Sequence, residues 1–232
     1  MTDPSTTREA WTLGRMYFQL DRPTESYVLS HSLDYGVAGK ALVNETAALG
    51  DPAVMMIAKE QYGLFRFLAA QLQCRRALDL GTFTGLSALA LAEGMGPEGR
   101  VTTIDRNPVW VDIARKHWLE AGVSERIDVR VGEASDLLHE LAADPSQRFD
   151  IAFLDVDKAR IRDYFEATLA LLEPRGLIMI DNALWHGWVL DETRVDPDTV
   201  GMRSFNDWIA GDTRLEAVIL PVADGLTLIR RR

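Results

Sequence analysis

A strand, a glycine turn and a helix follow one another in residues 77–92, ALDLGTFTGLSALALA. The first four residues predict a short apolar strand, and the alanine- and leucine-rich end predicts a helix. Gly81 and Gly85 bound the turn, and a turn with so few side chains lets a ligand lie against the backbone at a helix N-terminus. This run therefore predicts a cofactor loop in an α/β fold.

The cofactor loop lacks the GxGxxG and GxxxxGK[ST] patterns of dinucleotide and P-loop proteins. Asp79 lies one residue before the strand ends, where a carboxylate repels a pyrophosphate and attracts an ammonium. The implied ligand is a nucleoside with a positive charge rather than phosphates, and S-adenosylmethionine (SAM) fits. Met55 and Met56 could cover this cofactor, although methionines at helical spacing more often pack in a core.

Strands and helices alternate after the cofactor loop, which predicts a doubly wound, mostly parallel sheet in one α/β domain. The pattern changes after Asp181, where Leu215–Val222 and Gly225–Arg230 predict an antiparallel hairpin that completes a seven-stranded sheet. Residues 1–50 are predicted as an N-terminal helical extension of a core over residues 51–232. The predicted parallel strands are Ala77–Leu80, Arg100–Asp105, Ile127–Val131, Phe149–Asp155 and Gly176–Ile180.

Composition limits the partners that this chain can bind. Its 232 residues carry a net charge of −10, which argues against nucleic acid and against an anionic membrane surface. The single cysteine, Cys74, excludes an internal disulfide and fits a reducing compartment. The sequence shows no signal peptide and no apolar run of the ~20 residues that a membrane span needs, so we expect a cytoplasmic protein.

In a doubly wound sheet the ligand lies beyond the carboxyl ends of the strands, where this chain places polar residues. Asp105 ends the second strand, 24 residues after Gly81, where a carboxylate accepts the hydroxyls of a ribose. A solvated helix-capping aspartate is the alternative. Glu133 and Ala134 would then flank the adenine.

A set of hard oxygen ligands follows two later strands, at Asp155, Asp181 and Asn182. Two carboxylates and one carboxamide suit Mg²⁺, Mn²⁺ or Ca²⁺ rather than zinc, and we expect Mg²⁺. Two capping aspartates and a turn asparagine would give the same pattern.

Lys158 follows the first of these ligands by three residues. Four lysines and 21 arginines make up the 25 basic residues of the chain, so a lysine at this position is informative. An arginine could not give up its proton, whereas a lysine beside a cation and a sulfonium could act as a base. A surface lysine at the start of a helix is the alternative.

The four histidines do not cluster, so a histidine metal site is not expected. His117 falls on an apolar stripe and is predicted to pack in the core, and His139 is predicted on a helix surface. His186 lies between Trp185 and Trp188 after the Asp181-Asn182 turn, where it could line a substrate mouth or be an ordinary loop histidine.

Five segments resemble those of the cation-dependent class I O-methyltransferases, the family that includes catechol and caffeoyl-CoA O-methyltransferases. DLGTFTGLSALALA resembles its cofactor loop, VTTIDRNP its ribose strand and FDIAFLDVDKARIRDYFE its metal and catalytic-lysine segment. IDNALW resembles its second metal segment, and DGLTLIRR resembles its closing strand. The segments occur in the family's order over roughly residues 50–232.

The resemblance implies a SAM-dependent enzyme that methylates one hydroxyl of a catechol-like vicinal diphenol or a hydroxycinnamoyl-type small molecule. It implies a divalent cation on Asp155, Asp181 and Asn182, Lys158 as base, and a homodimer. Around SAM it implies Met55, Ile57, Asp79, Gly81, Thr82, Ser87, Asp105, Ala134, Asp155 and Asp157.

Two residues depart from the family pattern. His186, next to Trp185, replaces an asparagine that touches substrate in the plant enzymes, so both residues are predicted against the substrate. Tyr62 stands where the family often has glycine, near the N-terminal cofactor contact.

Two other functions remain as alternatives. A nicotinamide-dependent dehydrogenase could use the same type of sheet, but the missing GxGxxG argues against it. A non-catalytic or regulatory SAM-binding protein would not need the four residues Asp155, Asp181, Asn182 and Lys158.

Overall fold

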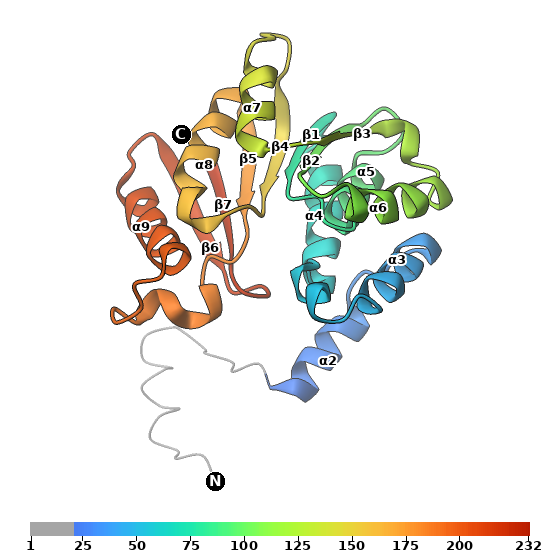
Figure 1. The fold of residues 1–232 in the computed structure, drawn as a ribbon, viewed down its shortest axis with the longest axis horizontal. Helices are drawn as coiled ribbons and strands as arrows, with labels where there is room; N and C mark the ends of the chain where they lie inside the picture. The colour runs from blue at the N-terminus through green and yellow to red at the C-terminus, as the bar shows by residue number, and fades with distance from the viewer. Residues whose placement is uncertain (1–20) are drawn as a thin grey trace. The chain divides into compact units, whose positions relative to one another are not determined.

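The structure is a computed structural model that describes residues 21–232 (Figure 1). The chain divides into two compact units, Met1–Leu33 and Asp34–Arg232. The described part of the smaller unit contains α2 (Arg22–His31). The helix α3 (Val37–Ala47), which the sequence analysis placed in the extension, belongs to the larger unit, as does the short helix η1 (Asp51–Met55).

A seven-stranded sheet forms the centre of the larger unit, in the order β3-β2-β1-β4-β5-β7-β6. Strands β1 to β5 pair in parallel, and β7 pairs antiparallel with β5 and with β6. This confirms the predicted doubly wound sheet with its antiparallel hairpin. The strands are β1 (Arg76–Leu80), β2 (Arg100–Asp105), β3 (Ile127–Val131), β4 (Phe149–Leu154), β5 (Leu172–Ile180), β6 (Leu215–Leu220) and β7 (Leu226–Arg231).

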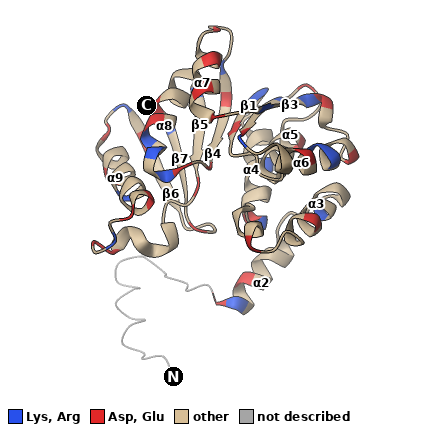
Figure 2. Cartoon of the chain, viewed as in Figure 1, with Lys and Arg blue, Asp and Glu red and all other residues tan. Residues whose placement is uncertain are grey.

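Helices cover both faces of the sheet, with α3 to α6 on one face and α7 to α9 on the other (Figure 1). Successive strand residues alternate between two buried apolar clusters: Ala77 packs with the first group of helices, and Leu78 with the second. Charged residues lie mostly on the outer helices and loops (Figure 2). The remaining helices are α4 (Lys59–Gln71), α5 (Leu86–Met95), α6 (Pro108–Glu120), η2 (Ser124–Arg126), α7 (Ala134–Ala142), η3 (Lys158–Arg160), α8 (Ile161–Leu171), η4 (Trp185–Leu190) and α9 (Pro197–Gly211).

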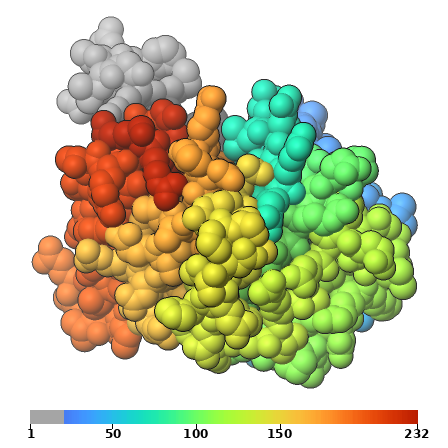
Figure 3. Space-filling view, turned by 90° about the horizontal axis from the view of Figure 1, so that it is seen from above, coloured from blue at the N-terminus to red at the C-terminus, as the bar shows by residue number. Residues whose placement is uncertain are grey.

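Local sequence signals explain most of these boundaries. Asn107 caps α6, because its side chain accepts a hydrogen bond of 3.0 Å from the backbone N–H of Val109, and Pro108 follows as the first helical residue. Strand β5 begins at Leu172, earlier than predicted, because Phe149 of β4 pairs with Leu172 across an irregularity in the ladder. Helices α7 and α8 lie side by side, yellow and orange in Figure 3.

The turn between β1 and α5 requires its two glycines. Gly81 has φ 96°, and a Cβ there would lie 2.1 Å from the carbonyl oxygen of Asp155. Gly85 has φ 91°, and a Cβ there would lie 2.6 Å from the side chains of Ala114 and Trp118. Any side chain would therefore push the cofactor loop away from the ends of the neighbouring elements.

Within residues 21–232, no helix has the length and apolar character needed to cross a membrane.

Candidate active site

The carboxyl ends of the parallel strands open into a cavity of about 770 Å³, a volume in the usual range for a small-molecule site. Of the predicted cofactor residues, the cavity is lined by Met55, Gly81, Asp105, Ala134, Asp155 and Asp157. Of the predicted metal, base and substrate residues, it is lined by Asp155, Lys158, Asp181, Asn182, Trp185 and His186. A small neighbouring pocket is lined by Ile57, Thr82 and Ser87. The strand ends thus bring together nearly all of the residues that the sequence analysis selected.

Asp79 is fully buried and lines neither pocket. The hydroxyl of Thr103 donates to its Oδ2 at 2.5 Å, and the hydroxyl of Thr82 lies 2.5 Å from that of Thr103. Because a hydroxyl has one proton to donate, Thr82 must donate to Thr103 in this chain of bonds. The Oδ1 of Asp79 has no hydrogen-bond partner among the described residues.

Burial raises the pKa of Asp79 to about 7, and the hydroxyls of Thr103 and Ser87 oppose this rise. The nearby charges of Asp155 and Asp105 raise it further. A buried carboxyl with one unpartnered oxygen next to the cofactor loop suits a cationic group of a ligand.

Asp105 ties the end of β2 to the cofactor loop. Its Oδ2 accepts the backbone N–H of Phe83 at 2.7 Å, and its Oδ1 accepts that of Asn107 at 2.8 Å. Asn107, rather than Asp105, is the N-cap of α6, so the alternative of a helix-capping aspartate is wrong. Asp105 faces the cavity, as a ribose ligand must.

Lys158 is buried and donates from Nζ to Oδ1 of Asp155 at 2.7 Å. The alternative of a surface lysine is therefore wrong. Asp157 precedes it as the cap of η3, where its Oδ1 accepts the backbone N–H of Ala159 at 3.0 Å. The short helix η3 directs Lys158 back toward the strand end that carries Asp155.

Asp181 is held by two donors on the same oxygen. Its Oδ1 accepts the Nε2 of Gln61 at 2.7 Å and the backbone N–H of Asn182 at 2.8 Å. Gln61 is itself fixed, because its Oε1 accepts the backbone N–H of Ala58 at 2.8 Å. One oxygen of Asp181 and one of Asp155 are thus occupied by protein donors, and the second oxygen of each remains for a ligand.

Burial, followed by the negative charge of Asp155, raises the pKa of Asp181 to about 7. Lys158, the Asn182 N–H and Gln61 oppose this rise. Two carboxyls of like charge in a buried site favour a bound cation. No group of three or more histidine, cysteine, aspartate or glutamate side chains that could hold a metal occurs in residues 21–232. The predicted set therefore depends on the Asn182 carboxamide, and its hard oxygen donors fit Mg²⁺, Mn²⁺ or Ca²⁺.

The wall of the cavity that carries Trp185 and His186 is a turn in an uncommon backbone conformation. Trp185, His186 and Gly187 have φ angles of 45°, 57° and 78°. Asp224, in the turn between β6 and β7, holds this wall: its Oδ1 accepts the backbone N–H of His186 at 2.7 Å, and its carbonyl accepts that of Leu184 at 2.9 Å. The strained turn is held by neighbours far away in the sequence, and it presents Trp185 and His186 to the cavity.

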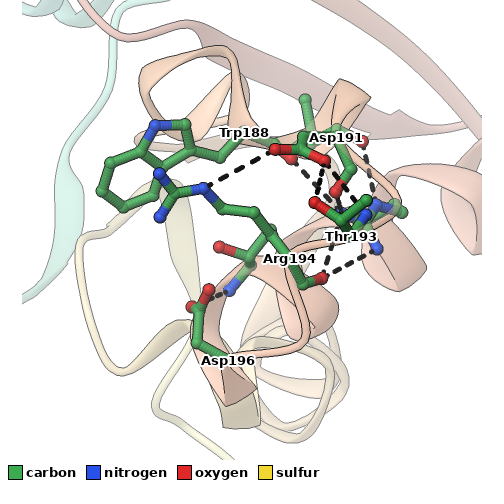
Figure 4. Close-up of polar contacts among 8 residues, drawn as sticks. Trp188, Asp191, Thr193, Arg194 and Asp196 are labelled. Carbon is green, nitrogen blue, oxygen red and sulfur yellow. Dashed lines mark hydrogen bonds and ion pairs between the residues drawn. The ribbon is translucent and has the colours of Figure 1, made fainter.

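Beyond this turn the chain forms its own polar network (Figure 4). Arg203 of α9 donates to the carbonyls of Trp188, Val189 and Asp191 at 3.3, 2.9 and 2.6 Å. The guanidinium of Arg194 lies 3.7 Å from the centre of the Trp188 ring and 3.9 Å from the Asp191 carboxylate. The wall of the cavity is therefore fixed to α9.

The sequence analysis missed several residues that line the cavity, and it placed Tyr62 near the cofactor, which the structure does not. The missed residues include Gln61, Phe83, Trp110, Tyr164, Asp198 and Asp224. Phe83, Tyr164 and Asp224 had a signal, since each belongs to one of the segments that resemble the family: DLGTFTGLSALALA, FDIAFLDVDKARIRDYFE and DGLTLIRR. Tyr62, expected near the cofactor, does not line the cavity but is buried in the core, with its hydroxyl donating to Glu93 at 2.5 Å. The predictions of a buried His117 and an exposed His139 are confirmed.

A family model described as O-methyltransferase matches residues 30–232. The chain belongs to the O-methyltransferase family. The family resemblance and the prediction of a SAM-dependent O-methyltransferase are thereby confirmed.

Individual relatives agree with this assignment. The chain is 36% identical over 208 residues to "Probable caffeoyl-CoA O-methyltransferase 2" of Dictyostelium discoideum, covering 89% of this chain and 90% of that protein. It is 34% identical to the catechol O-methyltransferase of Niastella koreensis, covering 81% and 87%. The crystal structure of an O-methyltransferase from Bacillus cereus in complex with SAH superimposes with a TM-score of 0.83 at 30% identity, covering 90% and 97%.

Proposed function

We propose that this enzyme transfers a methyl group from SAM to one oxygen of a small acceptor with two adjacent hydroxyls, of the catechol or hydroxycinnamoyl type. The observation that carries the proposal is the buried contact between Lys158 and Asp155 beside Asp181, next to the glycine turn. The relatives named for catechol and caffeoyl-CoA support the acceptor type.

The cofactor would lie along the loop that follows β1. The close approach at Gly81 leaves its backbone free of side chains, and Asp105 faces the cavity where it can accept the ribose hydroxyls. The unpartnered Oδ1 of Asp79 suits the ammonium of the methionine part. Bacillus cereus and Streptomyces achromogenes O-methyltransferases, solved with SAH and with SAM, support this choice of cofactor.

The divalent cation would be held by Asp155, Asp181 and Asn182, all three of which line the cavity. When bound, such a cation supplies a Lewis acid that makes neighbouring hydroxyls more acidic. Lys158 would take the proton from the attacking hydroxyl at its Nζ, and Asp155 orients that nitrogen. Aromatic side chains, among them Phe83, Trp110 and Trp185, line part of the cavity and would limit water around the bound ligands, which favours a reaction in which a sulfonium and a phenolate lose their charges.

Turnover of a simple catechol with labelled SAM tests this proposal. Methylation that needs Mg²⁺ or Mn²⁺ and stops in EDTA is expected. SAM binding without turnover on any catechol would favour the regulatory alternative, and tight NAD binding would favour the dehydrogenase. A homodimer and a cytoplasmic location remain predictions.

A further inference from the structure

The end of the cavity formed by Asn182, Trp185, His186, Asp198 and Asp224 (the acceptor end) is rich in carboxylates and poor in cations. The lysine and arginine side chains that line the cavity among residues 21–232 are Lys158 and Arg106, and the His186 ring lies at the acceptor end. Lys158 is already paired with Asp155, and Arg106 follows the ribose residue Asp105 at the end of β2. Neither leaves a free positive charge at the acceptor end.

Two carboxylates converge on one side of this end. The Oδ1 of Asp157 and the Oδ1 of Asp198 accept the same backbone N–H, that of Ala159, at 3.0 and 3.1 Å. The approach is fixed because α9 packs directly on η3: a Cβ at Gly201 would lie 2.3 Å from the carbonyl oxygen of Lys158. Neither carboxylate forms an ion pair with a described lysine or arginine.

Asp224 supplies a third carboxylate from the opposite side. Its Oδ1 accepts the His186 N–H, but its Oδ2 is buried without a hydrogen-bond partner in the described part of the chain. The nearest basic group is the His186 ring, whose Nδ1 lies 3.9 Å away. A donor or a cationic group of a ligand is therefore favoured beside this carboxylate, and an anionic group there is repelled.

In the described part of the chain, no arginine forms an ion pair with Asp157, Asp198 or Asp224. Arg203 uses its guanidinium on backbone carbonyls, and Arg194 lies over Trp188 beside Asp191 (Figure 4). The loop that leads into α9 adds further acidic residues (Figure 2). They are Asp191, Glu192 and Asp196.

We propose that the acceptor end selects uncharged or cationic phenols and rejects anionic ones, including CoA thioesters. The inference rests on the proposed function, because it concerns the part of the acceptor remote from the reacting hydroxyl. A unit charge a few ångströms from an unpaired carboxylate changes affinity several-fold even in water, and more in a partly buried site. The name of the Dictyostelium relative supports a dihydroxyphenyl group at the reacting end of the acceptor, but for the charge of the remote part it would suggest the opposite preference.

A matched series of 3,4-dihydroxyphenyl acceptors tests this inference on the full-length enzyme. The series carries an aminoethyl, a methyl or a propanoate group, and a fourth member is the CoA thioester of dihydroxycinnamate. We expect kcat/KM for the propanoate and the thioester to be at least about 10-fold below that for the methyl compound. The amine should match or exceed the methyl compound, and added salt should narrow the differences.

Two variants assign the effect to the acceptor end. Asp198→Asn and Asp224→Asn keep an oxygen for the Ala159 and His186 N–H groups and remove one charge each. Each should raise kcat/KM for the propanoate relative to the methyl compound by about 3- to 10-fold. Asp207→Asn, an exposed position on the same helix as Asp198, is the matched control and should leave the ratio unchanged.

Calorimetric binding of the same acceptors in the presence of S-adenosylhomocysteine and Mg²⁺ separates the two proposals. Acceptors that bind in the expected charge order without being methylated would contradict the proposed function and keep the charge selection. Equal or tighter binding of the propanoate or the thioester, or ratios that do not respond to both variants, would overturn the charge selection.

Discussion

Lys158 shows how the burial of one residue decides its chemistry. The four lysines of the chain made this position noticeable in the sequence, but only the structure shows its Nζ bonded to Asp155 in the interior. A buried ammonium must be paired, and a pair at the edge of a cavity can exchange its proton with a ligand.

Lys158→Ala should lower turnover on a catechol by ~10²–10⁴-fold, the usual range for a general base. Lys158→Arg should lower turnover as well, because arginine keeps its proton. SAM affinity, measured by calorimetry, should change little in either variant. Near wild-type turnover of Lys158→Arg would mean that this residue supplies only a positive charge.

Gln61 should control the affinity for the divalent cation through Asp181. Gln61→Met removes the bond to Asp181 Oδ1 while keeping the side-chain length, so the carboxylate loses a fixed orientation. A hydrogen bond to a charged group contributes about 1.5–3 kcal/mol, so we expect Mn²⁺ affinity, followed by electron paramagnetic resonance, to fall about 10-fold. Gln71→Met, at the exposed end of the same helix, is the control. Unchanged Mn²⁺ affinity would show that Gln61 does not position this ligand.

Asp79 should release a proton when SAM binds below pH 7. Its pKa of about 7 in the folded protein lies above the ordinary 3.8, so the carboxyl is mostly protonated at pH 6. The ammonium of SAM favours the charged form, so at pH 6 binding should release about one proton from this group. The same raised pKa means that its contribution to stability is lost as the pH rises from 3.8 through 7. Calorimetry of SAM binding in buffers of different ionisation enthalpy measures the number of protons released. Asp79→Asn should reduce this number. An equal release in the variant would assign the proton to another group.

At the scale of elements, local sequence signals were enough to predict the strands of the sheet but not the conformation of the cavity wall. The glycines after β1 and the polar residues at the strand ends are readable because each depends on its immediate neighbours in the sequence. The turn at Trp185 and His186 depends instead on Arg203 and Asp224, which approach it only after α9 and the hairpin have packed. Gln61 was missed for the same reason, because its partner Asp181 is 120 positions away.

Arg203 should therefore affect binding of the acceptor more than binding of the cofactor. Arg203→Met removes the bonds to the carbonyls of Trp188, Val189 and Asp191, so the wall formed by Trp185 and His186 loosens. We expect KM for a catechol to rise about 10-fold, with SAM affinity within about twofold of wild type. Arg115→Met, at an exposed position of α6, controls for loss of a charge. Equal losses of SAM and acceptor binding would indicate a general loss of structure instead.

At the scale of the whole molecule, the catalytic apparatus and the proposed dimer contacts lie in different units. The sheet, both apolar clusters and every residue that lines the cavity belong to Asp34–Arg232. The smaller unit shows a large exposed apolar side chain at Tyr27, 63% exposed. We expect Trp11, Tyr17 and Phe18 of the same N-terminal segment to add apolar surface to the dimer contact, and these three lie outside the described residues.

Removal of residues 1–33 should therefore separate folding from association. The fragment 34–232 retains all seven strands and both clusters, so it should unfold cooperatively and bind SAM within about threefold of the full chain. Light scattering at micromolar concentration should give a dimer mass for the full chain and a monomer mass for the fragment. The reason is that burial of the aromatic side chains of the N-terminal segment would drive association. A monomeric full chain would contradict the homodimer. A dimeric fragment would move the contact to the larger unit, and a fragment that fails to bind SAM would mean that residues 1–33 contribute to the cofactor site.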